Sequence, residues 1–321
     1  MLIKKNQFEE EKKNNYSIAI GNFDGIHKGH RFLLKELNKF KKLGTDKIGV
    51  LSFVPHPVKV LAPNKWRKNL IKFRTKYLQL KSQNIDTLFL VTFNKSFSNL
   101  SAEIFIEDIL LKKININNII VGKDFKFGNN REGDITLLGK YAKKNKFKLL
   151  CYEKKKSEDL DEVYSSSIIR DLIRSGEIVH ANKLLGYKWE VTGKVIKGKA
   201  KGRELGYPTA NLKYSYQIAP SKGIYACWTN IEGTEKWYKS AVSTGIRPHY
   251  KGVEEILEVY IFNFSGNLYQ KRIRVAFVSK IRNEEIFNNE EDLKDKMKKD
   301  CIKVESILSK NFIIDNNEGL K

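Results

Sequence analysis

The chain has 321 residues, of which 41% are hydrophobic, and a formal net charge of +23. Because single cores stop growing near roughly 250–300 residues, this length predicts two domains. The positive charge is mostly lysine, spread in short runs along the whole sequence rather than gathered into a stripe. We therefore expect no specific nucleic-acid binding and attribute the charge to a biased composition.

The spacing of the cysteines and the distribution of apolar residues indicate the cellular compartment of the protein. Cys151, Cys227 and Cys301 are far apart and lack metal-ligand spacing, which is typical of a reducing environment. No apolar run approaches the roughly 20 residues of a membrane span, and the polar N-terminus does not resemble a secretory signal. These features predict a cytoplasmic location without a membrane partner, and they leave the oligomeric state undefined.

The first motif follows an apolar strand predicted at Ser17–Ile20. It reads Gly21-Asn22-Phe23-Asp24-Gly25-Ile26-His27-Lys28-Gly29-His30, which indicates a glycine-rich turn leading into a helix that begins at Ile26 or His27. The free N–H groups and dipole of a helix N-terminus favour a phosphate at such a turn. His27 and His30, three residues apart, would lie on one helix face and add donors to the same anion.

The histidine pair has two alternative interpretations. The two residues could be ordinary surface histidines, but Gly21, Gly25 and Gly29 indicate close backbone approach or positive φ, which a solvent-exposed helix does not need. They could also belong to a metal site, but no carboxylate or cysteine cluster adjoins them. Phosphate binding is the favoured hypothesis.

The first half of the chain alternates strands with helices. One helix follows the first motif and ends near Gly44, and another is predicted over Leu100–Lys113 with Ser101 as its N-cap. This alternation predicts a doubly wound parallel sheet, in which ligands bind beyond the carboxyl ends of the strands. The predicted strands are Ser17–Ile20, Ile48–Phe53, Thr87–Phe93, Asn118–Val121 and Phe147–Tyr152.

Two later segments would lie on the same ligand side. The loop that contains Asp124, Phe125 and Phe127 follows a predicted strand, although packing alone would account for its aromatic residues. The run Tyr164-Ser165-Ser166-Ser167-Ile168-Ile169-Arg170 precedes a helix. Its serines could be N-caps of that helix, but a cap needs one such residue and the run has three. The arginine could bind a triphosphate.

From about Tyr187 the pattern changes to short strands and turns, which predicts a small antiparallel barrel closed by a helix over Glu290–Ser309. The segment Ser166–Leu185 would link the two domains. The predicted strands are Trp189–Ile196, Gly223–Thr229, Trp237–Val242, Ile256–Phe262 and Arg272–Val278.

The barrel also contains the segment Gly198–Asn211, which combines glycines, cations and short polar side chains. On its own this segment is compatible with a mobile hairpin loop as well as with a nucleotide site.

Several of these motifs resemble those of known families. GNFDGIHKGH is similar to the phosphate-binding signature of the nucleotidylyltransferases, and SSSIIR resembles their second signature. The first signature is shared in part by class I aminoacyl-tRNA synthetases, so the pair is more specific than either alone. VGKDFKFG and Pro55-His56-Pro57 look like the FAD synthetase branch. GRELGYPTANL is similar to the riboflavin kinase signature, and Leu257-Glu258-Val259-Tyr260 resembles the strand that carries that family's catalytic glutamate.

The chain thus resembles the bifunctional bacterial riboflavin kinase/FAD synthetase family over about residues 14 to 305. The resemblance implies an FMN adenylyltransferase domain at 1–186, a riboflavin kinase domain at 187–321, and riboflavin, FMN, ATP and Mg²⁺ as ligands. It implies catalytic roles for Glu258, His27, His30 and Arg170. It implies ATP or phosphate contacts for Gly21, Asn22, Phe23, Asp24, Gly25, Gly29, Ser165, Ser166, Ser167, Gly198, Gly202 and Pro208. It implies flavin contacts for Asp124, Phe125, Phe127, Arg247 and Arg282, and Mg²⁺ contacts for Thr209 and Asn211.

The sequence departs from the family pattern at several positions. Ser243 stands where the family usually has Asn, and His249 where it has Thr, so the flavin-side loop of the kinase is the least conventional part. Val54, Ser167 and Ile168 also differ, although Ser167 keeps the hydroxyl of the usual Thr.

Two alternative functions stay open from the sequence. One is a nucleotidylyltransferase for another phosphorylated acceptor, and the other is a non-catalytic flavin-sensing or nucleic-acid-binding protein on the same scaffold.

Overall fold

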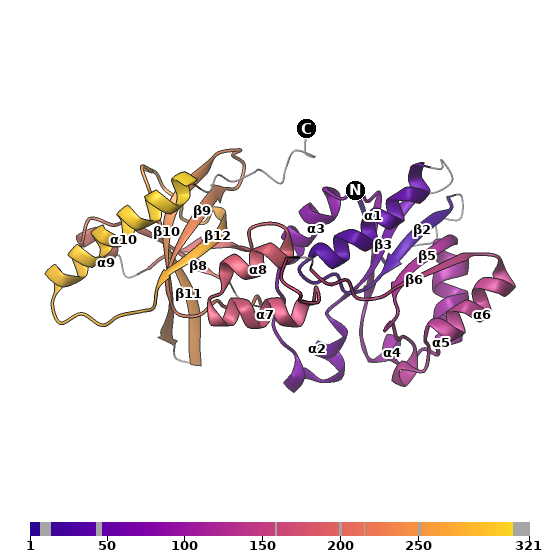
Figure 1. Cartoon of the computed structure of the whole chain (residues 1–321). Helices are drawn as coiled ribbons and strands as arrows, with labels where there is room; N and C mark the ends of the chain where they lie inside the picture. Colours follow the sequence, from indigo (N-terminus) through magenta and orange to yellow (C-terminus); the bar gives the residue numbers. More distant parts are fainter. Residues whose placement is uncertain are drawn as a thin grey trace. The chain divides into compact units, whose positions relative to one another are not determined.

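The computed structural model describes residues 1–6, 14–42, 47–157, 159–198, 201–214, 216–249 and 252–310, without the side chains of 42, 201, 246–249 and 252–255. The chain forms two compact units (Figure 1). Among the described residues, the N-terminal unit contains Met1–Arg67 and Lys76–Tyr164, and the barrel unit contains Lys68–Thr75 and Ser165–Lys310.

The N-terminal unit is built on a six-stranded parallel sheet with the order β1-β4-β3-β2-β5-β6. All five residues of β2 are buried, as expected for a continuous apolar run in a parallel sheet covered on both faces. The prediction of a doubly wound parallel sheet is confirmed. The strands are β1 (Leu2–Lys5), β2 (Tyr16–Ile20), β3 (Lys47–Val54), β4 (Thr87–Thr92), β5 (Ile116–Gly122) and β6 (Lys148–Tyr152).

Helices and short turns connect these strands. They are α1 (Lys28–Lys42), α2 (Pro57–Leu61), η2 (Pro63–Lys65), α3 (Phe73–Lys81), α4 (Lys95–Ser98), α5 (Ala102–Ile104), η3 (Phe105–Ile114), η4 (Asn129–Arg131) and α6 (Ile135–Asn145). From Lys76 onward, α3 is grouped with this unit. Strand order reverses at β2, which pairs with β3 on one side and β5 on the other. The loops that follow β2 and β5 therefore emerge at a switch point of the sheet, where ligands of such folds bind.

One predicted helix differs in kind from the expectation. The segment predicted as a helix over Leu100–Lys113 begins with the short α5, for which Ser101 is the N-cap as predicted, and continues as the π-helix η3. The wider turn brings residues five apart into line. Phe105 and Leu110 both face the core in this way, together with Ile106 and Ile114.

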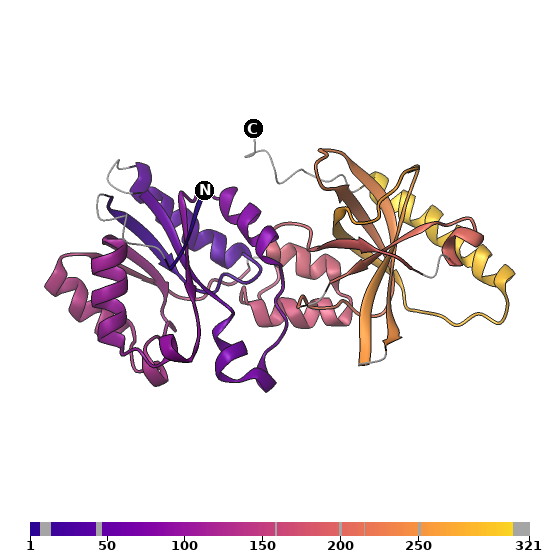
Figure 2. The ribbon, with the colours of Figure 1, turned by 180° about the vertical axis from the view of Figure 1, so that it is seen from behind.

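The barrel unit contains a closed antiparallel barrel with the order β10-β11-β8-β7-β12-β9 (Figure 2). The predicted barrel and its closing helix are confirmed. The strands are β7 (Glu190–Ile196), β8 (Thr209–Lys213), β9 (Gly223–Ile231), β10 (Trp237–His249), β11 (Gly252–Ile261) and β12 (Arg272–Arg282). The helices are α7 (Ser166–Ser175), α8 (Ile178–Leu185), α9 (Lys201–Glu204) and α10 (Glu290–Lys310).

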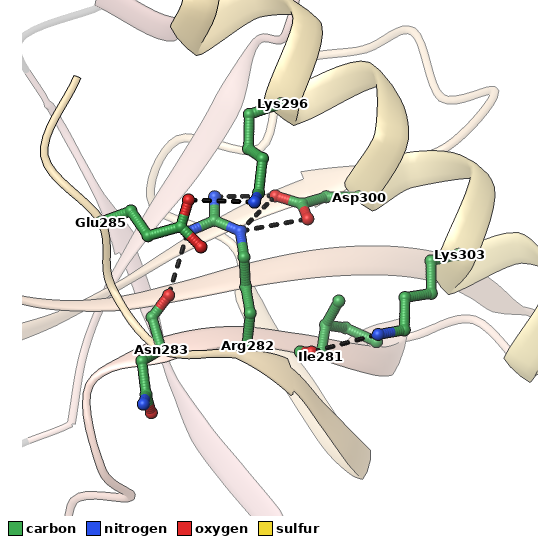
Figure 3. A network of polar contacts seen from close by, with 7 residues as sticks. All are labelled: Ile281, Arg282, Asn283, Glu285, Lys296, Asp300 and Lys303. Carbon is green, nitrogen blue, oxygen red and sulfur yellow. Dashed lines mark hydrogen bonds and ion pairs between the residues drawn. The ribbon is translucent and has the colours of Figure 1, made fainter. Parts of the chain in front are cut away.

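Helix α10 packs against the outer face of the barrel and is fixed there by a buried ion pair. Val304 and Leu308 are fully buried in a cluster with residues of β9 and β12. At the end of β12, Arg282 forms a two-pronged contact with Asp300 of α10, with N–O distances of 2.8 to 3.1 Å (Figure 3). Lys303 donates to the carbonyl of Ile281 at 3.3 Å. Because both charges of the pair are shielded from water, its geometry fixes the helix on the strand.

Candidate active sites

The loop between β2 and α1, residues 21–27, has an unusual backbone. Phe23, Gly25 and Ile26 have φ values of 46°, 87° and 39°. Gly25 adopts this left-handed region at little cost, but a β-branched residue such as Ile26 does so only where surrounding structure holds it. Asp24 and Ile26 are both buried, at 5% and 0% exposure. The loop is therefore locked by its packing, as is common for loops that bind ligands. We call residues 21–30 the histidine loop.

Helix α1 begins at Lys28, one or two residues later than the predicted start at His27 or Ile26. His27 is therefore its N-cap. Its carbonyl accepts from the N–H of Arg31 at 3.0 Å, and its ring Nδ1 accepts from the N–H of His30 at 3.3 Å. Because Nδ1 is an acceptor, the proton of the neutral ring is assigned to Nε2. The rings of His27 and His30 stack with centroids 3.7 Å apart. The prediction that the two histidines share one side is confirmed.

Both imidazoles are held in the neutral form near pH 7. Burial lowers the pKa of His27 to about 4, partly offset by a backbone hydrogen bond. Burial, the neighbouring His27 and the positive charge of Lys76 place the pKa of His30 well below its usual range. Among the described residues, the buried atoms Asn22 Oδ1 and His30 Nδ1 have no hydrogen-bond partner. Unpaired buried polar atoms are rare and mark places where a ligand would supply the partner.

Gly29 is required by the space around the histidine pair. A Cβ there would lie 3.2 Å from ring atoms of His27 and 2.9 Å from Cβ of Tyr164. A Cβ at Gly21 would instead be in ordinary contact with the ring of Phe23, at 3.4 Å. Of these two glycines, only Gly29 keeps room for the imidazoles to stack.

The loop after β5 carries the residues predicted to bind flavin in the first site. Phe127 is 7% exposed and belongs to the core, where its ring lies 5.4 Å from those of Phe105 and Phe125. Phe125 is half-buried and stacks on Phe127, while the exposed Asp124 pairs with Lys154 at 2.9 Å. A ligand at this loop would meet Phe125, supported from beneath by Phe127.

The serine run lies at the start of α7 in the barrel unit. Ser165 is the N-cap and accepts from the N–H of Ser167 at 3.2 Å, which is the capping role weighed from the sequence. Arg170 is 9% exposed, and its guanidinium donates to the carbonyls of Lys68 and Ser166, both at 3.1 Å. Within its own unit, Arg170 therefore fastens the segment that contains Lys68 to the first turn of α7.

The second site gathers polar residues on one face of the barrel. In register, Glu258 of β11 lies opposite Asn211 of β8 on one side and Ser243 of β10 on the other. Two glycines press against this row, since a Cβ at Gly198 would lie 2.2 Å from Nδ2 of Asn211, and a Cβ at Gly202 would lie 3.3 Å from Oγ1 of Thr209. Gly198 and Gly202 thus lie beside Asn211 and Thr209, and Asn211 is the register partner of Glu258.

A cavity of about 580 Å³ lies on the side of β8 and β11 to which Ala210 and Val259 turn, and not on the side of the row. Its walls come from the segment 203–210, which includes Pro208 and Thr209, from the loop 264–269, and from Val195, Val259 and Ile261. Arg203 is the cationic residue in its lining. Apolar walls with a few polar groups at one edge are typical of a site for a small ligand.

Of the two arginines predicted to contact flavin, the structure describes the side chain of Arg282 and not that of Arg247. The side chain of Arg247 lies outside the described residues, as does that of His249, and both positions belong to β10 by their backbone. Arg282 is engaged with Asp300 and donates to the carbonyl of Asn283 at 2.9 Å (Figure 3). A ligand reaching Arg282 would meet a guanidinium already committed to α10.

One residue that contacts the histidine loop was not predictable from the sequence. Lys76 of α3 donates from Nζ to the carbonyl of Asn22 at 2.6 Å. It is one among many lysines of the chain and is more than 50 residues from the loop, so no local pattern distinguishes it.

The fold and the two sites define a nucleotidylyltransferase-like α/β unit followed by a small antiparallel barrel with its own ligand cavity. Within the part of the chain that the structure describes, no helix is long and apolar enough to cross a membrane. A family model for FAD synthetase matches residues 9–167, and one for riboflavin kinase matches residues 185–308.

Curated relatives agree with both matches. The chain is 38% identical to the bifunctional riboflavin kinase/FMN adenylyltransferase of Buchnera aphidicola subsp. Schizaphis graminum, covering 89% of this chain and 92% of the relative. It is 33% identical to the protein of the same name from Escherichia coli K12, covering 88% and 90%. A crystal structure from Streptococcus pneumoniae, described as a macrolide-efflux protein, matches with a TM-score of 0.83 at 27% identity, covering 97% of this chain and all of that one. The chain belongs to the family of bifunctional riboflavin kinase/FMN adenylyltransferases.

Proposed function

We propose that this protein phosphorylates riboflavin to FMN with one ATP and adenylylates FMN to FAD with a second ATP, releasing pyrophosphate. The observation that carries the proposal is that both family models match in sequence order, while relatives named for both activities cover about nine-tenths of the chain. We assign the adenylyltransferase domain to 1–186 and the kinase domain to 187–321. The reactions take place in the cytoplasm, in keeping with the dispersed cysteines.

In the kinase reaction, the ribityl hydroxyl of riboflavin attacks the γ-phosphorus of ATP, and the bond to ADP breaks. Glu258 accepts or orients the proton of that hydroxyl. Thr209 and Asn211 supply oxygen atoms of the kind that Mg²⁺ prefers, and the absence of a side chain at Gly198 and Gly202 lets the backbone approach these two residues closely. When bound with ATP, the metal neutralises charge on the transferred phosphoryl group.

In the adenylyltransferase reaction, a phosphate oxygen of FMN attacks the α-phosphorus of ATP, and the bond to pyrophosphate breaks. FMN brings its own nucleophile, so the protein needs donors for the charge that develops on the phosphate oxygens. Nε2–H of His27 is one donor, because Nδ1 is occupied by the cap of α1. His30 is the other donor from the N-terminal unit. From the sequence resemblance alone we also assign phosphate contacts to Ser165, Ser166 and Arg170.

The test is to incubate the purified protein with ATP and Mg²⁺, with riboflavin in one reaction and FMN in another, and to separate the flavins. Riboflavin should give FMN and then FAD, and FMN should give FAD with release of pyrophosphate. The variant His30→Ala should lose FAD formation and keep riboflavin phosphorylation, because His30 belongs to the N-terminal unit. A protein that makes FMN but never FAD would refute the second activity. One that adenylylates a different phosphorylated acceptor would favour the rival transferase.

A further inference from the structure

Helix α3 holds the histidine loop at two points. At the first point, the carbonyl of Asn22 accepts from Nζ of Lys76 at 2.6 Å and from the hydroxyl of Ser52 at 3.3 Å. At the second point, the carbonyl of Ile26 accepts from Nε of Arg31 at 3.3 Å, and Nη2 of Arg31 donates to Oε1 of Gln79 at 2.5 Å.

These two points bracket the strained part of the loop. Asn22 and Ile26 lie on either side of the segment 23–25, and Phe23, Gly25 and Ile26 have left-handed φ values. Non-glycine residues persist in that region only where the surroundings impose it. Lys76 and Gln79 lie three residues apart on α3, so both side chains project from one face of the helix. One helix face therefore restrains both ends of the segment that places His27.

Lys76 also brings positive charge close to the histidines. It is half-buried, and burial lowers its pKa, an effect that the negative charge of Asp24 opposes. Its charge in turn contributes to the low pKa of His30. A cation in a partly desolvated position acts strongly on nearby groups, because the effective dielectric constant there is below that of water.

We propose that Lys76 and Gln79 are positioning residues for FMN adenylylation, which keep the histidine loop in its reactive conformation through Asn22 and through Arg31. The inference rests on the proposed function of that loop. Neither residue needs to touch the substrate. Their effect is exerted through the backbone that carries His27 and His30.

The experiment uses the full chain with Lys76→Met and Gln79→Met, which keep an extended side chain of similar size but remove the hydrogen bonds. Lys72→Met is the matched control, because Lys72 is also half-buried and donates to a carbonyl at 2.6 Å, but its partner is Thr192 in the barrel unit. Rates of FAD formation from FMN and of FMN formation from riboflavin are measured on each preparation. Riboflavin phosphorylation reports whether the barrel unit is folded, and hydrogen exchange of peptides from β2 and β5 reports whether the N-terminal unit is folded.

We expect Lys76→Met to lower kcat for FAD formation about 10²-fold, the loss that a misplacement of about 1 Å produces, and Gln79→Met to lower it about 10-fold. KM for ATP should change less than kcat, and riboflavin phosphorylation should be retained. Ring signals in NMR titrations should show a higher pKa for His30 in Lys76→Met, because one of the charges that lowers it is gone. Lys72→Met should keep FAD formation.

Adenylylation within about threefold of wild type in both α3 variants would overturn the proposal. An equal loss in Lys72→Met would overturn it as well, because the effect would then belong to any half-buried lysine. If Lys76→Met loses the hydrogen-exchange protection of β2 and β5 through misfolding, Gln79→Met decides alone. A wild-type protein that forms no FAD from FMN would instead refute the proposed function itself.

Discussion

Replacing His27 by Asn should make the N-terminal unit less sensitive to acid. Burial lowers the pKa of His27 to about 4, whereas an unfolded histidine titrates near 6.5. Between these values the unfolded chain takes up a proton that the folded unit does not. The stability contributed by the neutral ring is therefore complete above pH 6.5 and is lost as the pH falls toward 4. From about pH 7.5 to about pH 5, the loss amounts to about 2 kcal/mol.

Asparagine is the informative replacement because its Oδ1 can take the place of Nδ1. The variant can keep the hydrogen bond that caps α1 through the N–H of His30, and it no longer titrates. Hydrogen exchange of peptides from β2 and α1 gives the opening free energy of this unit at both pH values. The carboxylates are common to both proteins. Because His27 also lowers the pKa of His30, the difference reports the titration of His27 together with its effect on His30.

The wild type should lose about 2 kcal/mol more than His27→Asn between the two pH values. Equal losses in the two proteins would mean that the ring of His27 is accessible enough to take up a proton in the folded state. The reasoning from its burial would then be wrong, and so would the assignment of its proton to Nε2 as a permanent donor.

Three further predictions concern the barrel unit. Glu258→Gln should lower riboflavin phosphorylation by about 10²-fold or more if Glu258 is a general base, and should leave FAD formation from FMN unchanged in the same flavin assay. Kinase rates close to wild type would remove Glu258 from the mechanism. Asp300→Ala should destabilise the barrel unit by about 3 kcal/mol in urea unfolding, because the guanidinium of Arg282 loses its closest carboxylate and keeps the more exposed Glu285 at 3.8 Å. The double variant Arg282→Met with Asp300→Leu should lose less unfolding free energy than Asp300→Ala, because no charge is left unpaired. An equal loss in the two proteins would contradict this explanation by charge. Ser243→Asn places an amide beside Glu258 in the strand register and should tighten riboflavin or ATP binding by a factor that corresponds to about 1 kcal/mol, measured as KM. Weaker binding would indicate that Ser243 is compensated elsewhere.

The elements that the sequence predicted are those with a strong local pattern. β2 is a continuous apolar run ahead of a glycine-rich turn, so both the parallel sheet and the histidine loop could be located from the residues alone. The polar strand β8 was missed, because Thr209 and Asn211 interrupt the apolar alternation that marks a strand. Its place in the barrel comes from pairing with β7 and β11, which is long-range information.

The contacts of the site were less predictable than its motifs. The partner of Arg282 is Asp300, 18 residues later, on the buried face of α10 with Val304 and Leu308. No local pattern indicates which cation this carboxylate meets. The contacts of Lys76 and Gln79 with the histidine loop depend on which face of α3 is turned toward that loop. Packing of the helix determines this orientation. The motifs of this chain therefore indicate where the sites lie, whereas the residues that hold those sites in place become visible only in the fold.

The closed barrel limits which changes in chain length the kinase site can tolerate. Asn211 and Leu212 are neighbours on β8, with Asn211 facing the row of Glu258 and Leu212 fully buried on the opposite side. Deleting one residue within β8 would exchange these two faces, since side chains alternate along a strand, and a barrel without a free edge offers the strand no other place to slide. Insertions in the loop 264–269 carry no such penalty. Length variation among natural or engineered variants should therefore accumulate in that loop and be absent from β8.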